Sequence, residues 1–222
     1  MKHIVKILAI AHVTPDVLQF IVEKPEHFHF TPGQATDVSI NQEDWIDEKR
    51  SFTFTSIPSN DFLEFTIKTY PDHKGVTNKL LSLQKEDELI LHKVFGEISY
   101  QEEGVFVAGG AGVTPFLSIF RYLREQDRMG NNKLIFANKT RADIIHEEEL
   151  DNLLGEKFIN VLSEQEIPGY GHGFITRDIL ETNIIRNTDF VYVCGPPPMM
   201  KSIEKILVEL DIQGQFIIKE SF

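Results

Sequence analysis

Cysteine is nearly absent from this sequence, with Cys194 as the only one among 222 residues. A single thiol forms no internal disulfide, and it does not by itself hold an iron–sulfur cluster or a four-cysteine zinc site. The G-x-x-x-x-G-K-[ST] pattern of P-loop proteins and the G-x-S-x-G pattern of serine hydrolases are also missing. These absences exclude several classes of metal site and leave P-loop and serine-hydrolase chemistry without support.

Positive charge and long apolar runs are scarce as well. Lysine and arginine number 22 against 34 aspartates and glutamates, a formal net charge of −12, which argues against general DNA or RNA binding. No stretch approaches the roughly 20 apolar residues of a membrane span, and no small-residue cleavage site follows the apolar run at residues 7–11. We expect a cytoplasmic protein with no membrane span and no nucleic-acid partner.

What the chain has is an ordinary globular composition, 41% hydrophobic and 25% charged, arranged differently in its two halves. The first half contains short segments rich in Val, Ile, Phe and Thr, separated by Pro, Asn, Asp and Gly. Many short strands at nearly regular spacing indicate an antiparallel β-barrel or sandwich, with one helical interruption at 77–83. The predicted strands cover residues 3–11, 17–22, 35–40, 51–56, 62–68 and 88–93.

After Gly104 the pattern changes to short apolar runs that alternate with helical segments. Continuous apolar strands alternating with helices are typical of a parallel sheet covered on both faces. We place the domain boundary near residues 101–104, which divides the chain into residues 1–101 and 102–222. The predicted strands of the second half are 105–108, 134–137, 158–162, 190–194 and 216–218, and its predicted helices are 115–126, 147–154 and 197–210.

A glycine-rich turn follows the first strand of the second half, with the sequence G-G-A-G-V-T-P at residues 109–115. Glycines let backbone N–H groups approach a ligand closely. Thr114 is a candidate N-cap and Pro115 a candidate first helical residue, so a helix N-terminus would point at a bound pyrophosphate. A tight turn needed only for packing is the alternative. Because Pro115 replaces the last glycine of G-x-G-x-x-G, the ordinary dehydrogenase fingerprint is not matched.

A second candidate anion site lies in the first half. Arg50 and Phe52 fall on one face of a predicted strand; arginine suits bidentate phosphate binding, and an aromatic ring can cover a flat ligand. Downstream, K-G-V-T-N at residues 74–78 precedes a helical segment whose N-terminus would face the same phosphates. From the residues alone, an ion pair of Arg50 with Asp47 or Glu48 and a plain turn downstream are the favoured alternatives.

Two histidine features suggest metal chemistry but lack partners. His27 and His29 lie on one face of an extended segment, and no convincing third ligand is nearby. His146 opens a segment like H-E-x-x-H, but Leu150 stands where a zinc protease has its second histidine. We therefore predict no metal site.

The barrel motifs resemble those of the ferredoxin–NADP reductase superfamily. R-S-F-T at 50–53 resembles its R-x-Y-[ST] flavin motif. P-G-Q at 32–34 is similar to its strand entry, and G-V-T-N at 75–78 is similar to its second flavin-phosphate motif.

The second half continues the resemblance in the family's order, so that it covers roughly residues 30–222. The turn at 109–115 resembles the nicotinamide-dinucleotide motif, and C-G-P-P-P-M at 194–199 resembles the C-G-P-x-x-M pattern. The acidic segment at 147–150 and the E-S-F at 220–222 are similar to the E-E-L and E-x-aromatic segments of the flavodoxin-reductase-like branch. Each motif is modest singly; together, at these spacings, they are a strong signal.

The resemblance implies a barrel that binds FAD, followed by an α/β domain that binds NADH or NADPH. Arg50 would hold the FAD pyrophosphate, and Thr53 would hydrogen-bond flavin N5. Phe52 would lie against the flavin without the hydroxyl of the usual tyrosine. Phe222 would stack on the flavin face that nicotinamide must occupy and would swing away for hydride transfer. The other implied FAD-binding residues are Ser51, Ile67, Lys68, Gly75, Val76 and Thr77.

For the dinucleotide, the resemblance implies binding by the glycine turn and by the segment after the fourth strand. Thr53, Cys194 and Glu220 would be the catalytic residues at the place where hydride passes from nicotinamide C4 to flavin N5. A small core residue is the alternative for Cys194, and a solvated charge is the alternative for Glu220. The implied dinucleotide-binding residues are Gly110, Ala111, Gly112, Val113, Thr114, Pro115, Cys194, Gly195, Pro196 and Met199.

Glu164 favours NADH over NADPH in this interpretation. In the family, the cation that binds the 2′-phosphate tends to follow an apolar-Ser pair, and here the apolar-Ser pair at 162–163 is followed by this carboxylate. The carboxylate would repel the additional phosphate. Lys139 and Arg141 are the cations that could still reach it.

The predicted function is an NAD(P)H-dependent flavin oxidoreductase that passes electrons to an acceptor. The acceptor stays open among a ferredoxin, a flavodoxin, a haem or cluster protein of an oxygenase, and free flavin. The lone cysteine places any iron–sulfur centre on a partner, and the net charge of −12 makes an acidic partner a less natural match without a local basic patch. The alternatives are a non-catalytic FAD-binding electron-transfer subunit of a larger complex, and a flavin-free NAD-binding regulatory module. Flavin reduction by NADH would distinguish the enzyme from the non-catalytic subunit. A colourless purified protein would favour the flavin-free module.

Overall fold

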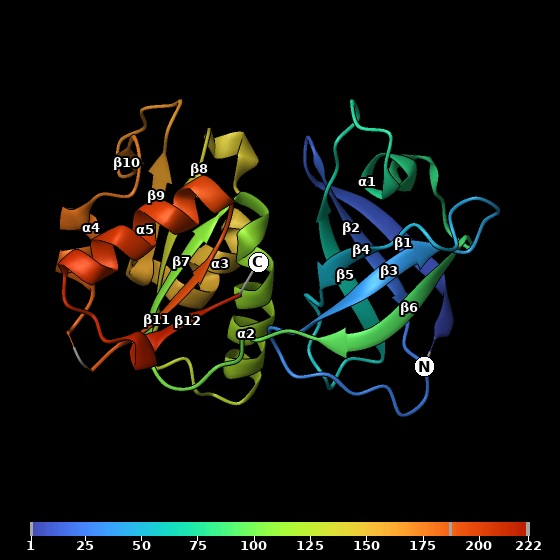
Figure 1. Ribbon diagram of the computed structural model, residues 1–222, viewed down its shortest axis with the longest axis horizontal. Coiled ribbons are helices and arrows are strands. Elements are labelled where there is room, and N and C mark those ends of the chain that lie inside the picture. Colours follow the sequence, from blue (N-terminus) through green and yellow to red (C-terminus); the bar gives the residue numbers. More distant parts are fainter. Residues whose placement is uncertain (1, 187, 221–222) are drawn as a thin grey trace.

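The strands of this chain form two sheets of six, one from each half of the sequence (Figure 1). The computed structural model describes residues 2–186 and 188–220. Phe222, for which we predict a flavin contact, lies outside the described residues.

The first sheet is entirely antiparallel and has the order β4-β3-β6-β1-β2-β5. A bridge between Phe54 and Phe65 joins its two outer strands, so the sheet closes as a barrel, as predicted. Phe20, Phe54 and Phe65 are fully buried inside it, and each such side chain stabilises the fold by roughly 1.5–3 kcal/mol. The strands are β1 (His3–Thr14), β2 (Val17–Glu23), β3 (Ala35–Ile40), β4 (Arg50–Thr53), β5 (Phe62–Lys68) and β6 (Glu88–Phe95).

One short helical segment interrupts the barrel strands between β5 and β6. It consists of α1 (Val76–Lys79) and the 3-10 turn η1 (Leu80–Ser82), close to the predicted helix at 77–83. Val76 and Leu80 are fully buried in the barrel core, so tertiary packing holds a segment that is too short to be a stable helix alone.

The second sheet is entirely parallel and has the order β10-β9-β8-β7-β11-β12. This confirms the predicted two-domain fold class. Its strands are β7 (Gly104–Gly109), β8 (Lys133–Asn138), β9 (Phe158–Leu162), β10 (Gly171–His172), β11 (Phe190–Cys194) and β12 (Ile217–Lys219). The connecting helices are α2 (Thr114–Glu125), α3 (Glu147–Leu154), α4 (Arg177–Asn183) and α5 (Pro197–Glu209).

Helices cover both faces of the parallel sheet, because successive strand residues point to opposite faces. Phe106 and Phe136 pack with α2 and α3 on one face, whereas Val107 and Ile135 pack with α4 and α5 on the other. Both sets are fully buried. The central strands are therefore predominantly apolar, which is why their pattern predicts a buried parallel sheet.

Two elements of the second half are not predicted. The strand β10 has two residues, and α4 buries only Leu180, so neither has enough periodic apolar positions to be recognised. The predicted strand at 216–218 begins one residue later, because Phe216 ends the 3-10 turn η5 (Gly214–Phe216).

Helix α2 lies between the parallel sheet and the barrel (Figure 1). Val17 at the start of β2 and Ile98 in the connection between β6 and β7 join the core formed by α2 and α3. The barrel and the second half therefore share an apolar core around this helix. Among the described residues, no helix has the length and apolar character needed to cross a membrane.

Candidate functional site

Two loops meet at the carboxyl edge of the parallel sheet where the strand order reverses, between β7 and β11. Ligands of open α/β sheets bind at this position. A Cβ on Gly112 would overlap the carbonyl oxygen of Cys194, and a Cβ on Gly195 would lie 3.1 Å from the backbone nitrogen of Gly109. The glycines therefore allow the predicted dinucleotide turn and the C-G-P segment to touch through their backbones.

The glycine turn also leaves space for a ligand. Gly110 has a φ of +51°, and nothing lies within 4 Å of the position that its Cβ would take. Residues 110–113 form the 3-10 turn η2, which leads directly into α2. The first N–H groups of such a turn have no intrahelical partners, so they suit the oxygens of a diphosphate.

The prediction that Thr114 is the N-cap of α2 is wrong. Thr114 is the first residue of the helix, Pro115 is the second, and the cap position falls on Val113. The Thr114 hydroxyl donates to the carbonyl of Ala111 at 3.0 Å. The reason is that the glycine segment is itself helical, so the helical backbone begins before the threonine.

Asn138 is a polar residue at this edge that the sequence analysis missed. It ends β8, one residue after Ala137, which pairs with Gly109. The side chain is buried, and its Nδ2 has no hydrogen-bond partner within the described ranges, a state shared only with Asn160 Oδ1 in the middle of β9. A buried donor without a partner costs free energy, so Asn138 suits an acceptor atom of a ligand. An asparagine that ends an apolar strand is the signal that could have found it.

Cys194 and Glu220 lie close enough for the charge of the carboxylate to affect the pKa of the thiol. Burial and, to a smaller extent, the charge of Glu220 together raise the pKa of Cys194 to about 12. The pKa of Glu220 is itself raised by burial and by the charge of Glu97. We name these three residues the Cys194 group. At neutral pH the thiol is protonated, so it acts as a small neutral side chain and is no nucleophile.

The Cys194 group is connected to the barrel through Glu97. Glu97 lies two residues beyond Phe95 of β6, and Phe95 pairs with Ala35 of β3. Ala35 pairs in turn with Thr53, the last residue of β4. Thr53 is half-buried. The structure thus brings Cys194 and Glu220 together and ties Thr53 to the same end of the barrel, while the catalytic roles of all three stay predictions.

The flavin-phosphate motifs of the barrel also converge. Arg50 is exposed, and one of its terminal nitrogens lies 4.0 Å from the position that a Cβ on Gly75 would take. Its other nitrogen donates to the carbonyl of Lys49 at 2.7 Å. Within the described part of the chain Arg50 forms no ion pair, neither with Asp47 nor with Glu48. Its guanidinium is therefore available to an anion.

Other predicted FAD residues are engaged in protein contacts. The Ser51 hydroxyl donates to Asp37 at 2.8 Å, Lys68 forms an ion pair with Asp16 at 2.6 Å, and Ile67 is buried in the barrel core. Phe52 is half-buried against the same core. Of these four, Phe52 has the side chain with the most freedom to contact a ring, and the FAD contacts of all four stay predictions.

No cluster of three or more His, Cys, Asp or Glu side chains suited to a metal ion is found in residues 2–186 and 188–220. His27 adopts a φ of +58° beside Phe28, so it belongs to a turn of the chain.

Comparisons with known proteins agree with this geometry. Residues 2–117 match the FAD-binding domain family, and residues 106–205 match the oxidoreductase NAD-binding domain family. The fold is that of a ferredoxin NADP+ reductase from Neisseria gonorrhoeae, described with bound FAD and NADP, with a TM-score of 0.84 at 21% identity over 99% of this chain and 98% of that one. The chain belongs to the ferredoxin reductase-like superfamily. As a ferredoxin reductase-like protein, it carries an FAD-binding and a nicotinamide-dinucleotide-binding domain.

Several curated relatives of this ferredoxin reductase-like chain are named as reductase or electron transfer components of oxygenases, and others are flavohemoproteins. It is 29% identical to the reductase component of propane 2-monooxygenase from Mycolicibacterium goodii, over 98% of this chain and 66% of that protein. It is 27% identical to the electron transfer component of anthranilate 1,2-dioxygenase from Acinetobacter baylyi, over 87% of this chain and 58% of that protein. The chain thus spans 58–66% of the length of these two relatives.

Proposed function

We propose that the chain is an NADH-dependent flavin oxidoreductase, with FAD on residues 1–101 and the dinucleotide on residues 102–222. One observation carries the proposal: the helix that begins at the glycine turn is hydrogen-bonded to the barrel segment that directly follows the Arg50–Thr53 motif. Two nucleotide-binding motifs on separate sheets therefore share one junction, which is what electron transfer between two bound cofactors requires.

On the barrel, Arg50 would hold the FAD diphosphate together with the backbone N–H groups of residues 75–77. The unpaired guanidinium of Arg50 beside Gly75 supports this assignment. Thr53 would hydrogen-bond the flavin edge, and Phe52 would contact the ring without a phenol hydroxyl. When bound, FAD supplies a ring that accepts hydride from a reduced nicotinamide and passes electrons on singly or in a pair.

On the parallel sheet, the N–H groups of residues 110–113 would hold the dinucleotide diphosphate, and the unpartnered Nδ2 of Asn138 would donate to the same ligand. Cys194 would pack against the nicotinamide as a neutral thiol. Glu220 would keep a proton near that site more readily than an exposed glutamate, because burial raises the pKa of its carboxyl group.

The preference for NADH rests on two cations that are already paired. Lys139 forms an ion pair with Glu164 at 3.0 Å, and the N–H of Glu164 donates to the Lys139 carbonyl at 2.8 Å. Arg141 forms an ion pair with Glu147 at 3.0 Å. Neither cation is left to attract a 2′-phosphate, and Glu164 would repel it. A higher kcat/KM for NADPH than for NADH would overturn this part of the proposal.

The proposed acceptor is the oxygenase component of a multicomponent oxygenase, or a ferredoxin that serves one. The names of the relatives from Mycolicibacterium goodii and Acinetobacter baylyi support this class. A small-molecule acceptor such as free flavin is the fallback if no protein acceptor is found. The lone cysteine is free and buried, which suits a reducing compartment, and the cytoplasm is our proposed location.

The deciding experiment is an anaerobic titration of the purified chain. A yellow protein whose flavin absorbance bleaches when NADH is added is the expected result. A yellow protein that NADH does not bleach would overturn the proposal in favour of a passive electron-transfer subunit. A colourless protein that stays colourless after incubation with FAD would leave only dinucleotide binding.

A further inference from the structure

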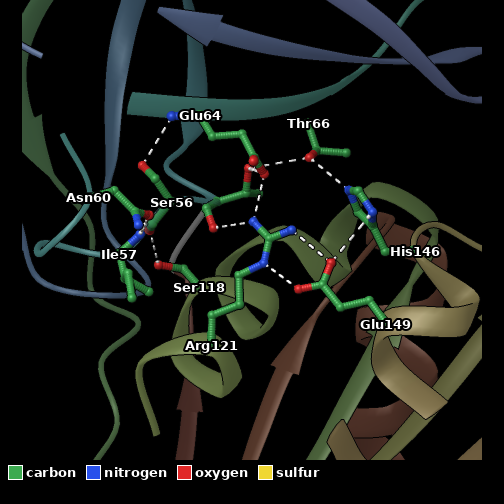
Figure 2. Close-up of polar contacts among 10 residues, drawn as sticks. Ser56, Ile57, Asn60, Glu64, Thr66, Ser118, Arg121, His146 and Glu149 are labelled. Carbon is green, nitrogen blue, oxygen red and sulfur yellow. Dashed lines mark hydrogen bonds and ion pairs between the residues drawn. The ribbon is translucent and has the colours of Figure 1, made fainter. Parts of the chain in front are cut away.

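Arg121, in the middle of α2, is the most heavily hydrogen-bonded side chain at the junction of the two sheets (Figure 2). Its Nη1 donates to the carbonyl of Thr55 at 2.7 Å and to Glu64 at 2.6 Å, both in the barrel half. Its Nε and Nη2 donate to the two carboxylate oxygens of Glu149 in α3, at 2.6 and 2.7 Å. One guanidinium thus spans both halves of the molecule.

The contacts of Arg121 continue into a closed ring of polar groups. Thr55 donates to Glu64 at 2.7 Å and lies 3.2 Å from the hydroxyl of Thr66. Thr66 lies 3.5 Å from Nε2 of His146, whose Nδ1 lies 3.6 Å from Glu149. We name the six residues the Arg121 ring: Thr55, Glu64, Thr66, Arg121, His146 and Glu149. Three come from the barrel and three from the second half.

Each charged side chain of the Arg121 ring has an oppositely charged partner, although the ring is largely buried. Burial alone would raise the pKa of Glu149, but the hydrogen bonds and the charge of Arg121 hold that pKa below its ordinary value. Burial and the charge of Arg121 lower the pKa of His146, so the imidazole is neutral at neutral pH. A guanidinium with four good donors and two carboxylates is a strong, directional contact.

A second set of hydrogen bonds lies one turn away on the same helix. Ser118 donates to the carbonyl of Ser56 at 2.8 Å, and Ser59 donates to Glu125. Residues 118, 121 and 125 are spaced by three and four, so they lie on one face of α2. This face carries the contacts to barrel residues 55–59 along its length.

Both ends of this arrangement lead to the proposed cofactor sites. Thr55 is two residues beyond Thr53, in the chain that leaves the flavin motif. Ser118 and Arg121 are four and seven residues beyond Thr114, which follows the glycine turn. A rotation of α2 against the barrel would therefore move the dinucleotide turn relative to the flavin motif, with no flexible segment between them.

We propose that Arg121 is a positioning residue: it holds α2 against the barrel so that a dinucleotide at the start of the helix meets the flavin at the distance that hydride transfer requires. This inference rests on the proposed function. Hydride transfer requires reacting atoms roughly 3–3.5 Å apart, and a misplacement of about 1 Å can cost about 100-fold in rate. Arg121 does not touch either reacting atom, so it should affect the reduction step and leave the binding of each cofactor intact.

The test compares the FAD-loaded wild type with the variants Arg121→Met, Arg121→Lys and Ser118→Ala. Stopped-flow reduction by NADH gives the limiting rate constant and the NADH dissociation constant separately. For Arg121→Met we expect the limiting rate to fall about 10- to 100-fold, with the dissociation constant within about twofold. Arg121→Lys keeps the charge but loses the planar fork, so it should lie between wild type and Met. Ser118→Ala removes one neutral hydrogen bond and should slow reduction about threefold.

Arg124→Met is the matched control, since Arg124 lies on the same helix, is exposed and forms no ion pair within the residues described. It should match the wild type in rate and affinity. Hydrogen–deuterium exchange of the FAD-loaded protein without NADH gives a second readout. Peptides covering residues 55–60 and 96–103 should exchange faster in Arg121→Met than in Arg124→Met. In the separate stopped-flow experiment with NADH, the long-wavelength absorbance of stacked nicotinamide and flavin should be weaker in Arg121→Met.

Two outcomes would overturn the inference: an unchanged limiting rate in Arg121→Met, or a loss confined to the NADH dissociation constant. If Arg121→Met does not retain FAD, Arg121→Lys and Ser118→Ala decide, and wild-type rates in both would overturn it. A wild-type protein that NADH does not reduce refutes the proposed function instead, and the exchange measurement then still reports whether Arg121 fixes the two halves.

Discussion

Two partly buried glutamates at the junction of the halves, Glu149 and Glu220, have pKa values shifted in opposite directions. Glu149 is held by the Arg121 fork, which keeps its pKa below the ordinary value. The pKa of Glu220 is raised by burial and by the charge of Glu97. In the Arg121 ring the charged side chains are paired with one another. In the Cys194 group the charge of Glu97 disfavours the charged form of Glu220, which a proton or a ligand would neutralise. We propose that the first holds the domains together and that the second takes part in the chemistry.

Arg50→Gln should have the largest effect, and it tests the part of the molecule left open for cofactors. Loss of two charge-assisted hydrogen bonds to a diphosphate, at about 1.5 kcal/mol each, should weaken FAD binding about 100-fold. The thermal stability of the apoprotein should not change, because Arg50 forms no ion pair in the described part of the chain. Fluorescence titration of the apoprotein with FAD measures the effect.

Lys49→Gln is the control for Arg50→Gln, as it removes a neighbouring positive charge. Equal losses of FAD affinity in both variants would mean that the net charge of the region, and not the geometry at Gly75, attracts the cofactor.

Glu64→Gln tests the Arg121 ring, the part of the junction in which the charged side chains are paired with one another. It replaces a charged hydrogen-bond acceptor of Arg121 with a neutral one, at a cost of roughly 2 kcal/mol in the free energy of unfolding. The affinity for FAD should stay unchanged. Chemical denaturation measures the loss, and Glu204→Gln serves as control. The ion pair of Glu204 with Lys219 is partly exposed and contributes at most about 1 kcal/mol. An equal loss in the control would remove the distinction between the two parts of the junction.

Glu164→Gln tests the proposed preference for NADH over NADPH. It removes the charge that repels a 2′-phosphate and releases Lys139, so the ratio of kcat/KM for NADPH to that for NADH should rise about tenfold. Steady-state kinetics with both dinucleotides measure it. Asp178→Asn changes an exposed acidic residue at the start of α4 and should leave the ratio as it is. An unchanged ratio in Glu164→Gln would show that the dinucleotide does not approach this residue.

Acidification should reduce the contribution of the Arg121 ring to folding stability and increase that of Glu220 in the Cys194 group. The folded-state pKa of His146 is lowered, so its contribution to stability is present above the unfolded pKa of about 6.5 and is lost as the pH falls below it. The contribution of Glu149 is lost later, as the pH falls below the ordinary glutamate value. Glu220 has the opposite sign, because its raised pKa favours the protonated, folded form.

Melting temperatures measured from pH 7 to pH 5 check this sequence of events. The wild type should lose stability over that interval, and His146→Gln should lose less of it. Glu220→Gln should lose as much as the wild type or more. An identical pH dependence in His146→Gln and the wild type would contradict the assignment of the acid response to this ring.

The smallest effect should be seen at Cys194, whose thiol we expect to react hardly at all with an alkylating reagent. A buried thiol whose pKa is about 12 should resist iodoacetamide at pH 8 in the native protein and react on unfolding. Mass spectrometry of the labelled protein measures this. Rapid native labelling would show that the Cys194 group is open and that its thiol is reactive.

Sequence pattern alone predicts most of the architecture. The regularly spaced short strands of the first half indicate an antiparallel barrel or sandwich, and the continuous apolar runs of the second indicate a covered parallel sheet. Helix 147–154 matches α3 at both ends. The short β10 and the α4 helix are missed because their stability comes from neighbours rather than from their own apolar periodicity.

The motifs at residues 50–53, 75–78 and 109–115 can be recognised in the sequence, because each depends on residues within a few positions of one another. A run of glycines before a helix sets the backbone of the 109–115 turn wherever the fold places it. The Arg121 ring, in contrast, forms only in the tertiary structure and could not be predicted from the sequence. Its partners Glu64 and Glu149 are 57 and 28 positions from Arg121 in the chain, and each alone has the spacing of an ordinary surface charge. Nothing local distinguishes such residues; the closing of the barrel and the docking of α2 bring them within hydrogen-bond distance.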